Sequence, residues 1–371
     1  MLWMTGGPGC SSEVALFGEN GPCKVSTDGT STTINPYSWN KNATMIYIDQ
    51  PTGTGFSYGT GFDHDEVGVA ADMYDFLQQF FKAHPQYQKN DFYVFGESYA
   101  GHYVPAVTHQ VWKNNKALPA GAIKINLVGL AIGNGLTDPQ EQYKHYPEMA
   151  ASTNDHKAAI GRLGIAAMKL AAPVCTSAIA KCNANNTNAC SSAMALCNLG
   201  LVSPYQATGL NPYDMRIKCA KPPLCYDFSN VATYLEQPAV QKALGVTKKW
   251  KDCNMIVNEM FQGDWMHNYQ TQIPEQLADG IRVLIYAGDQ DYICNWIGNK
   301  AWTVAMEWPH KADFNAATDE PWMAGGSKEA GKLRSANGFS FLQVYDAGHM
   351  VPLDQPENAL AMANAFMRNK L

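Results

Sequence analysis

Five apolar, β-branched runs, bounded by glycine or polar residues, constrain the fold of this chain more than any other feature. They are Ala43–Asp49, Asp91–Phe95, Ile125–Ile132, Ile281–Ala287 and Phe339–Tyr345, and Leu2–Met4 resembles the stub of another. Their apolar residues are continuous rather than alternating, which is typical of strands covered on both faces. Helical patterns lie between them, at Glu66–Lys82, Ala100–Lys116, Trp296–Met306 and Glu357–Met367. The alternation predicts an α/β fold with a doubly wound, mostly parallel sheet.

One long stretch interrupts this alternation. Between Asn134 and about Trp250 the sequence has alanine-rich helical segments (Met149–Ala172), a cysteine cluster and proline-rich loops, but no strand of this type. We interpret it as a helical cap inserted into the sheet domain. The chain would then consist of a first core part at 1–134, the cap at 135–250 and a second core part at 251–371.

Composition and charge exclude several classes of protein. Hydrophobic residues make up 46% of the 371 residues and charged residues 16%, whereas a disordered chain is rich in charge and poor in apolar residues. The formal net charge of −6 argues against nucleic acid as the main partner, because a polyanion is bound by basic patches. No apolar run approaches the roughly 18 residues of a membrane span, and the sequence has no charged-then-apolar leader.

Six of the ten cysteines cluster in the predicted cap, at Cys175, Cys182, Cys190, Cys197, Cys219 and Cys225. Seven residues are close to two helical turns, so Cys175 and Cys182 share one helix face, as do Cys190 and Cys197. Two antiparallel helices could therefore be joined by nested disulfides, Cys175–Cys197 outside and Cys182–Cys190 inside. The alternative is a zinc site, but the cluster has no C-x-x-C and no interleaved histidine, and this favours disulfides.

A candidate nucleophile follows the second apolar run. Asp91–Phe95 continues into Gly96-Glu97-Ser98-Tyr99-Ala100-Gly101, and helical sequence follows. This order is typical of a nucleophile elbow, the tight turn that exposes a serine oxygen above the strand ends. The strict pattern has glycine in place of Ala100. The alternative is an ordinary strand-to-helix turn with a capping serine.

A serine nucleophile needs a histidine base, and the histidine needs a carboxylate to hold its tautomer. With this elbow the chain order is serine, acid, histidine, each on a loop after a strand. Asp289 and Asp291 follow the fourth run, and His349 follows the fifth on a glycine-flanked loop. His102, on the helix after Ser98, is more consistent with a packed or capping residue. Spacing alone does not separate Asp289 from Asp291.

Acyl transfer also needs hydrogen-bond donors for the oxyanion. The backbone N–H of Tyr99, the residue after the serine, is one candidate. The glycine-rich loop Thr5–Gly9 is the other, since glycines let a backbone approach closely. Taken alone, that loop could equally cradle a phosphate, but it lacks the lysine of a P-loop.

Six segments, in this order along the chain, carry a resemblance to a known family. They are Thr5–Ser12, Asp49–Pro51, Gly55–Tyr58, Gly96–Gly101, Gly288–Trp296 and Gly348–Pro352. From residue 2 to the C-terminus the chain resembles the serine carboxypeptidase family, which includes lysosomal and vacuolar enzymes. The resemblance implies an α/β-hydrolase fold with a helical cap, and an enzyme that cleaves single residues from peptide C-termini.

The resemblance also implies roles for the residues at matching positions. Ser98 is the nucleophile, His349 the base and Asp291 the acid, because the family's acid stands three residues before the cysteine of a D-x-I-C pattern. Gly7 and Tyr99 supply the oxyanion N–H groups. In the pockets, Cys294 and Met350 lie on the wall for the leaving residue and Trp265 lines the neighbouring pocket, although plain buried packing is the alternative for Cys294 and Met350.

The family binds the terminal carboxylate of its substrate through positions that are Thr5, Glu19 and Glu97 here. Two clustered acids in a partly dry pocket raise each other's pKa, so that one can be protonated and donate to the substrate. We therefore expect activity that is favoured at acidic pH. Position 5 is usually asparagine in the family, whereas a threonine offers a single hydroxyl donor.

The resemblance implies four disulfides: Cys10–Cys253, Cys175–Cys197, Cys182–Cys190 and Cys219–Cys225. Cys23 and Cys294 remain as free thiols. No metal and no organic cofactor is implied. The expected partners are peptide or protein C-termini, with a homodimer left open and no nucleic acid or membrane span.

Two other functions remain open. Some plant members of the family use the same triad as acyltransferases, but Glu19 and Glu97 serve a free carboxylate and give no obvious help to an alcohol acceptor. A non-catalytic binding protein on the same scaffold is the second, although such proteins usually lose the serine or the histidine, and Ser98 and His349 are both present.

The compartment and the length of the chain lead to a last expectation. Disulfides and the glycosylation acceptors Asn42-Ala43-Thr44 and Asn185-Asn186-Thr187 indicate an oxidising compartment: lysosome, vacuole or extracellular space. In the family, a signal peptide and the first strands of the sheet precede the strand that Met1–Met4 matches. We therefore expect a truncated chain that needs those strands in order to fold and act.

Overall fold

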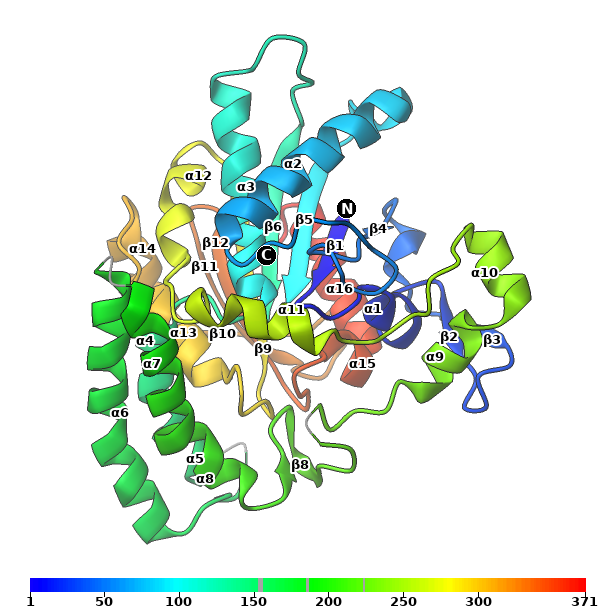
Figure 1. The fold of residues 1–371 in the computed structure, drawn as a ribbon. Helices are drawn as coiled ribbons and strands as arrows, with labels where there is room; N and C mark the ends of the chain where they lie inside the picture. The colour runs from blue at the N-terminus through cyan, green and yellow to red at the C-terminus, as the bar shows by residue number, and fades with distance from the viewer. Residues whose placement is uncertain (153–155, 185–186, 223) are drawn as a thin grey trace.

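The computed structural model describes residues 1–152, 156–184, 187–222 and 224–371, and an eight-stranded sheet forms its centre (Figure 1). In order across the sheet, the strands are β10 (Glu320–Trp322), β11 (Gly331–Ala336), β12 (Phe339–Val344), β9 (Arg282–Gly288), β6 (Leu127–Gly133), β5 (Phe92–Glu97), β1 (Leu2–Thr5) and β4 (Ile46–Tyr47). From β12 to β4 every neighbouring pair is parallel, and β10 and β11 are antiparallel additions at one edge. The predicted α/β class with a mostly parallel sheet is confirmed.

The central strands contribute side chains to two separate cores, one on each face of the sheet. On β1, Leu2 and Met4 belong to one buried cluster and Trp3 to the other. On β5, Val94 and Phe95 divide in the same way. Because successive side chains of a strand point to opposite faces, a continuous apolar run is the pattern that such a strand requires.

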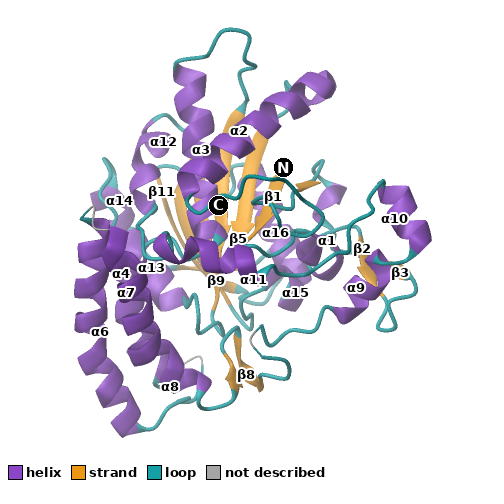
Figure 2. Cartoon of the chain, viewed as in Figure 1, coloured by secondary structure: helices purple, strands orange, loops and turns teal. Residues whose placement is uncertain are grey.

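Helices cover both faces of the sheet, as Figure 2 shows. Helices α2 (Glu66–Ala83) and α3 (Ala100–Lys116) pack on the first cluster, and α16 (Pro356–Met367) packs on the second. With α13 (Trp296–Ala305), these are the four helices that the sequence predicted, and their bounds agree to within one residue. The other helices of the two core parts are α1 (Glu13–Gly18), α11 (Met255–Met260), α12 (Pro274–Ala278), α14 (Lys311–Ala316) and α15 (Val351–Asp354).

The sheet differs from the prediction at its two edges. The run Ala43–Asp49 forms only the two-residue strand β4, because its neighbour β1 pairs with it at only two positions. At the other edge β10 and β11 were not predicted. Pro321 stands inside β10 and argues against a strand from sequence alone, although proline is tolerated on an edge.

The helical cap lies between β6 and β9, and within the described residues every strand of the main sheet either ends by Gly133 or begins at Arg282 or later. The main feature of the cap is the pair of helices α6 (Arg162–Asn183) and α7 (Thr187–Cys197), which lie side by side at the lower left of Figure 1. Among the described residues, the cap also has the α-helices α4 (Pro139–Gln142), α5 (Tyr146–Ala150), α8 (Ser203–Gln206), α9 (Ser229–Leu235) and α10 (Pro238–Leu244), and the hairpin of β7 (Leu210–Asn211) and β8 (Asp214–Lys218).

The predicted helical segment Met149–Ala172 is wrong in extent. Helix α5 ends at Ala150, and α6 begins only at Arg162 and then continues to Asn183. The residue before α6 is Gly161, whose backbone is extended with ψ at 161°, so the helix starts after it. Alanine content alone therefore indicated helix correctly but not where the helix begins.

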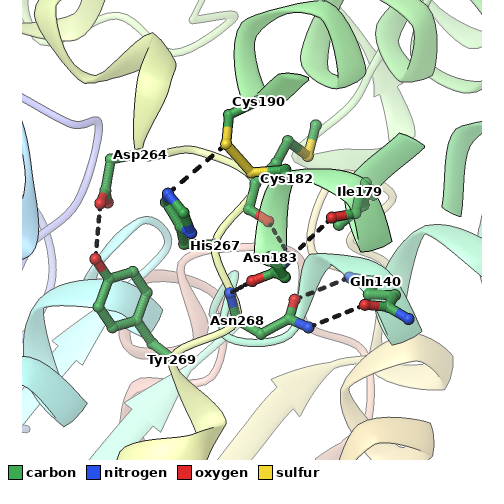
Figure 3. Close-up of a disulfide and its surroundings, with 10 residues drawn as sticks. Gln140, Ile179, Cys182, Asn183, Cys190, Asp264, His267, Asn268 and Tyr269 are labelled. Atoms are coloured by element: carbon green, nitrogen blue, oxygen red, sulfur yellow. Dashed lines mark hydrogen bonds between the residues drawn. A yellow bond between two sulfur atoms is a disulfide. The ribbon is translucent and has the colours of Figure 1, made fainter. Parts of the chain in front are cut away.

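Four disulfides join the pairs that the resemblance implied: Cys10–Cys253, Cys175–Cys197, Cys182–Cys190 and Cys219–Cys225. Two of them bridge α6 and α7 in the nested order expected from helical spacing. Near the inner one, Nε2 of His267 lies 3.7 Å from the sulfur of Cys190 (Figure 3). Both sulfurs are bonded to each other, so they are not available as the thiolate ligands of a zinc site.

Helix α6 is an exception to the expectation of no membrane-spanning segment. By length and composition alone it is apolar enough to cross a membrane, although Lys169 interrupts its apolar sequence. Core helices pass the same test, so the indication is weak. One face of α6, with Cys175, Ile179 and Cys182, is buried in the main apolar cluster.

Candidate active site

The predicted nucleophile elbow forms where β5 meets α3. Ser98 occupies the turn with φ at 68°, in the left-handed region that side chains other than glycine rarely adopt. A Cβ at Gly96 would lie 2.6 Å from the Cβ of Ala100, and one at Gly101 would lie 2.4 Å from the carbonyl oxygen of Leu136. The small residues around Ser98 therefore allow the close packing that holds this turn.

Asp291 and His349 form the second part of the site. Nδ1 of His349 lies 2.7 Å from Oδ2 of Asp291, and the two residues are 2% and 0% exposed. Backbone N–H groups of Ile293 and Cys294 donate to the same carboxylate. A buried carboxylate with these donors stays in place and can stabilise a protonated imidazole.

This geometry separates the two aspartates that spacing could not. Asp289 is also buried, but its Oδ1 accepts a hydrogen bond from the side chain of its neighbour Gln290. The carboxylate of Asp291 instead meets His349. His102, the weaker histidine candidate, is buried, stacks on Tyr99 and pairs through Nδ1 with the carbonyl of Leu136, which fits a packed residue.

The oxyanion segments meet beside the serine. A Cβ at Gly6 would lie 2.3 Å from the backbone nitrogen of Tyr99, so only glycine lets the loop after β1 lie this close to the elbow. Gly7 has φ at 117°, which also favours glycine. Gly7, Ser98 and Tyr99 line the same cavity. The two backbone N–H groups predicted to bind the oxyanion thus belong to segments that touch at Ser98.

Two buried glutamates and a buried threonine form a cluster near the serine, which we call the acidic cluster. Thr5, Glu19 and Glu97 are 6%, 1% and 1% exposed. The Thr5 hydroxyl accepts a hydrogen bond from the indole of Trp3, so its own hydrogen is free to donate elsewhere. Within the described part of the chain, the carboxyl oxygens of Glu19 and Oε2 of Glu97 have no hydrogen-bond partner outside the pair, and the two carboxyl groups lie close enough to bond each other when one is protonated. Buried polar atoms without a partner are typical of a binding site for a polar ligand.

The two acids of this cluster do not both ionise readily. Burial raises the pKa of Glu19 to about 7. Burial, followed by the negative charge of Glu19, raises the pKa of Glu97 well above its ordinary range. At mildly acidic pH the pair therefore holds at least one proton that it can donate to an anion.

Two cavities meet at Ser98. The smaller, of about 70 Å³, is lined by Thr5, Glu97, Ser98 and His349 together with the apolar residues Val14, Leu224, Tyr226, Phe228 and Met350. The larger, of about 290 Å³, is lined by Ser98 and Tyr99 together with Tyr143, Tyr146, Met194, Val202, Trp265, Ile293 and Cys294. The predicted pocket residues are thus divided, with Met350 in the smaller cavity and Cys294 and Trp265 in the larger one. Cys294 and Met350 therefore do not line one cavity, although both were expected on the wall for the leaving residue.

A metal at this site would have to use Asp291, Cys294 and His349, whose ligand atoms all lie within 4.8 Å of one another. The Nδ1 of His349 is already paired with Asp291. Without a bound cation, burial raises the pKa of the Cys294 thiol well above its usual range, so that Cys294 is a neutral thiol. The group fits an acid–base pair with a neutral thiol beside it better than a metal centre.

Sequence reasoning missed Asn134, which contacts the candidate acid Asp291 directly. Its Nδ2 donates to Oδ2 of Asp291 at 2.9 Å, and its Oδ1 accepts the N–H of Gly288 at 3.0 Å. Asn134 follows strand β6 between two glycines, at the same sheet edge as the acid and the histidine. That position is the signal that could have found it.

The sequence matches the family described as serine carboxypeptidase over residues 1–369. It is 47% identical to Serine carboxypeptidase-like 49 of Arabidopsis thaliana, over 100% of this chain and 71% of that protein. It is 45% identical to Serine carboxypeptidase 3 of Oryza sativa, over 100% of this chain and 73% of that one. It is 43% identical to Carboxypeptidase Y homolog A of Sclerotinia sclerotiorum, over 100% of this chain and 67% of that protein.

The fold is also similar to a solved structure. Kex1 of Saccharomyces cerevisiae, described as a prohormone-processing carboxypeptidase, superposes with a TM-score of 0.85 and 26% identity. The match covers 99% of this chain and 82% of that one.

Proposed function

The chain belongs to the serine carboxypeptidase family, and we propose that it releases single residues from peptide C-termini at acidic pH. The observation that carries the proposal is one cavity that holds Ser98, His349 and the buried Glu97 together. A nucleophile with its base, beside an acid that can bind a carboxylate, fits the last peptide bond of a chain.

In the proposed reaction the Ser98 oxygen attacks the carbonyl carbon of that bond. His349 takes the serine proton and then gives it to the leaving nitrogen, while Asp291 stabilises the charged imidazole. The N–H groups of Gly7 and Tyr99 bind the oxyanion of each tetrahedral intermediate. Water, deprotonated by His349, attacks the acyl-enzyme, and the proton returns to Ser98 as the shortened peptide leaves.

The acidic cluster is proposed to select the C-terminus. A protonated Glu97 and the hydroxyl of Thr5 can each donate a hydrogen bond to the free carboxylate of the substrate. If both Glu19 and Glu97 were ionised, they would repel it. Binding therefore requires the protonated form of the pair, which is the reason to expect an acidic optimum.

Both cavities favour apolar side chains in the substrate. The leaving residue would contact Tyr226, Phe228 and Met350, and the residue on the acyl side would contact Tyr146 and Trp265. These walls are aromatic or aliphatic, so burying an apolar side chain there is favourable at about 25 cal/mol per Å².

Two measurements test the proposal. An active-site fluorophosphonate should label wild-type protein and fail to label Ser98→Ala. Wild-type protein should then hydrolyse an N-blocked Phe-Leu dipeptide but not its C-terminal amide at pH 5. Labelling without release of leucine, or transfer from an acyl-glucose ester to an alcohol at higher efficiency, would favour an acyltransferase instead. No labelling at all would favour a binding protein.

The compartment is also a proposal. Four disulfides and an acid-dependent site support an oxidising, acidic place of action, such as a lysosome, a vacuole or the extracellular space. Of the predicted glycosylation positions, Asn42 is exposed, and Asn185 lies outside the described residues. Mass spectrometry of the protein secreted from a eukaryotic host would test whether Asn42 and Asn185 are glycosylated.

A further inference from the structure

Tyr99 has a second hydrogen-bonding group that the reaction described above does not use. Its backbone N–H is assigned to the oxyanion, whereas its phenol O–H donates to Oδ2 of Asp264 at 2.7 Å. The two residues are 2% and 3% exposed and 165 positions apart. The ring packs against the rings of His102 and Trp265, whose centroids are 4.4 Å and 5.2 Å from its own.

Asp264 is well placed to fix that ring. Its other oxygen, Oδ1, accepts the phenol O–H of Tyr269, also at 2.7 Å, so both carboxylate oxygens are used. The nearby Glu66 is buried as well, and burial and the charge of Asp264 raise its pKa well above the ordinary range. Glu66 therefore stays neutral, and the two phenols both donate to the carboxylate of Asp264.

The segment that follows Asp264 is held by the cap (Figure 3). The side chain of Asn183, on α6, donates to the carbonyl of Met266 and accepts the N–H of Asn268. Asn268 in turn donates to Gln140, on α4. Asp264 therefore begins a segment that the cap fixes against the core. The cap does so through the end of α6 that carries the disulfide Cys182–Cys190.

Resting on the proposed function, we propose that Asp264 is a positioning residue for the oxyanion site. It holds the phenol of Tyr99, and through the rigid ring it fixes the direction of the N–H of Tyr99. The elbow needs such a restraint because the preceding residue, Ser98, sits in the left-handed region. Small misplacements of a group at the reacting centre are costly in rate.

A purely structural role for the same bond predicts a different result. In that case its loss lowers the melting temperature and leaves kcat unchanged. If Asp264 positions the oxyanion donor, kcat falls and KM does not, because the oxyanion forms only after substrate has bound.

The test compares Tyr99→Phe and Asp264→Asn with a matched control. Tyr99→Phe keeps the ring and the backbone N–H, and the amide of Asp264→Asn can no longer accept both phenols. Tyr93→Phe is the control, since Tyr93 lies in the same strand β5, is 4% exposed and donates its O–H to the carbonyl of Met367 at the far end of the strand. All three should lose some thermal stability.

We expect each of the first two variants to lower kcat on the blocked dipeptide about tenfold, part of the 10²–10³-fold that a lost oxyanion donor costs. KM should stay within about twofold, and labelling of Ser98 by the fluorophosphonate should slow in parallel. The double variant should be no slower than the slower single one, because both remove the same bond. Tyr93→Phe should keep the wild-type kcat.

Several results would overturn this inference. An unchanged kcat in Tyr99→Phe, or effects of the two substitutions that simply add, would reduce the bond to a structural one. An equal loss of kcat in Tyr93→Phe would do the same. These outcomes leave the proposed function intact as long as wild-type protein is labelled and hydrolyses the dipeptide. A wild-type protein that is not labelled would overturn both.

Discussion

Nδ1 of His349 lies 2.7 Å from Oδ2 of Asp291, although 58 positions separate the two residues in the chain. His349 lies on the loop after β12 and Asp291 on the loop after β9. These strands are parallel neighbours, so the two loops emerge at the same edge of the sheet. Because a carboxylate only accepts, the contact places the imidazole N–H at Nδ1, and Nε2 is the nitrogen that would take the serine proton in the proposed reaction.

Asp291→Asn should lower kcat by about 10⁴, because an amide donor would hold the imidazole in the wrong tautomer. Asp289→Asn is the matched control, since Asp289 is equally buried but contacts Gln290 instead. Its kcat should remain near the wild-type value. Steady-state kinetics on a blocked dipeptide measures both, and a larger loss in Asp289→Asn would show that the acid is misassigned.

The comparison of these aspartates also shows how far sequence alone could go. Strand order and turn glycines were enough to predict Ser98 and His349, because those signals are local. Spacing alone left Asp289 and Asp291 open, because the choice depends on side-chain direction after β9, and Asp291 was selected only through the D-x-I-C pattern of the resemblance. The pocket residues Tyr226 and Phe228 reach the site from the cap, far along the chain from Ser98. Such long-range contacts have no local pattern from which they could be predicted.

Asn134→Ala should lower kcat by about 10- to 100-fold, because the Asp291 carboxylate loses a charge-assisted hydrogen bond of 2.9 Å. Asn115→Ala is the control. Asn115 bonds the backbone N–H and carbonyl of Ile125 with its side chain, at the far end of α3 from the elbow. Both variants should lose stability in thermal unfolding, but only Asn134→Ala should lose kcat. Equal rates in the two variants would contradict a role for Asn134 at the acid.

KM for substrates with a free carboxylate should rise as pH rises through about 7, the pKa of Glu19. Above that pH Glu19 carries a negative charge that repels the substrate carboxylate, whereas Glu97, whose pKa is raised well above the ordinary range, keeps its proton. Glu19→Gln should keep KM flatter across this range, because glutamine stays neutral. The measurement is KM for the blocked dipeptide between pH 5 and pH 8. A wild-type KM that falls with rising pH would contradict the assignment.

The same acid should make stability depend on pH. The pKa of Glu19 is about 7 in the folded protein against 4.5 for an ordinary glutamate, so the native state binds its proton more tightly than the unfolded chain. The stabilisation is complete below pH 4.5 and is lost as pH rises through about 7, by about 3 kcal/mol at most. Relative to wild type, Glu19→Gln should therefore lose less stability between pH 5 and pH 8 in urea denaturation. A parallel decline in both proteins would exclude Glu19 as the group responsible.

The Cys294 thiol should react slowly with iodoacetamide at neutral pH. Burial, and then the charges of Asp291 and Glu97, raise its pKa well above the usual range, so little thiolate is present. Once a mercurial or an alkyl group is attached, it should occupy the cavity that Cys294 shares with Trp265 and Ser98. We expect kcat/KM to fall most for substrates with a large apolar residue on the acyl side. Mass spectrometry follows the modification and rate assays follow its effect.

Cys294→Ala and Cys23→Ser separate the two free thiols. Cys23 is half-buried on β2 (Cys23–Val25) and lines neither cavity at Ser98. Inhibition should therefore persist in Cys23→Ser and disappear in Cys294→Ala, which should itself remain active because alanine only enlarges the cavity. Full activity of wild-type protein after complete, verified modification of Cys294 would show that substrate does not pass this wall. Loss of inhibition in Cys23→Ser would show that the thiol reagent inhibits by modifying Cys23, which lies outside the site.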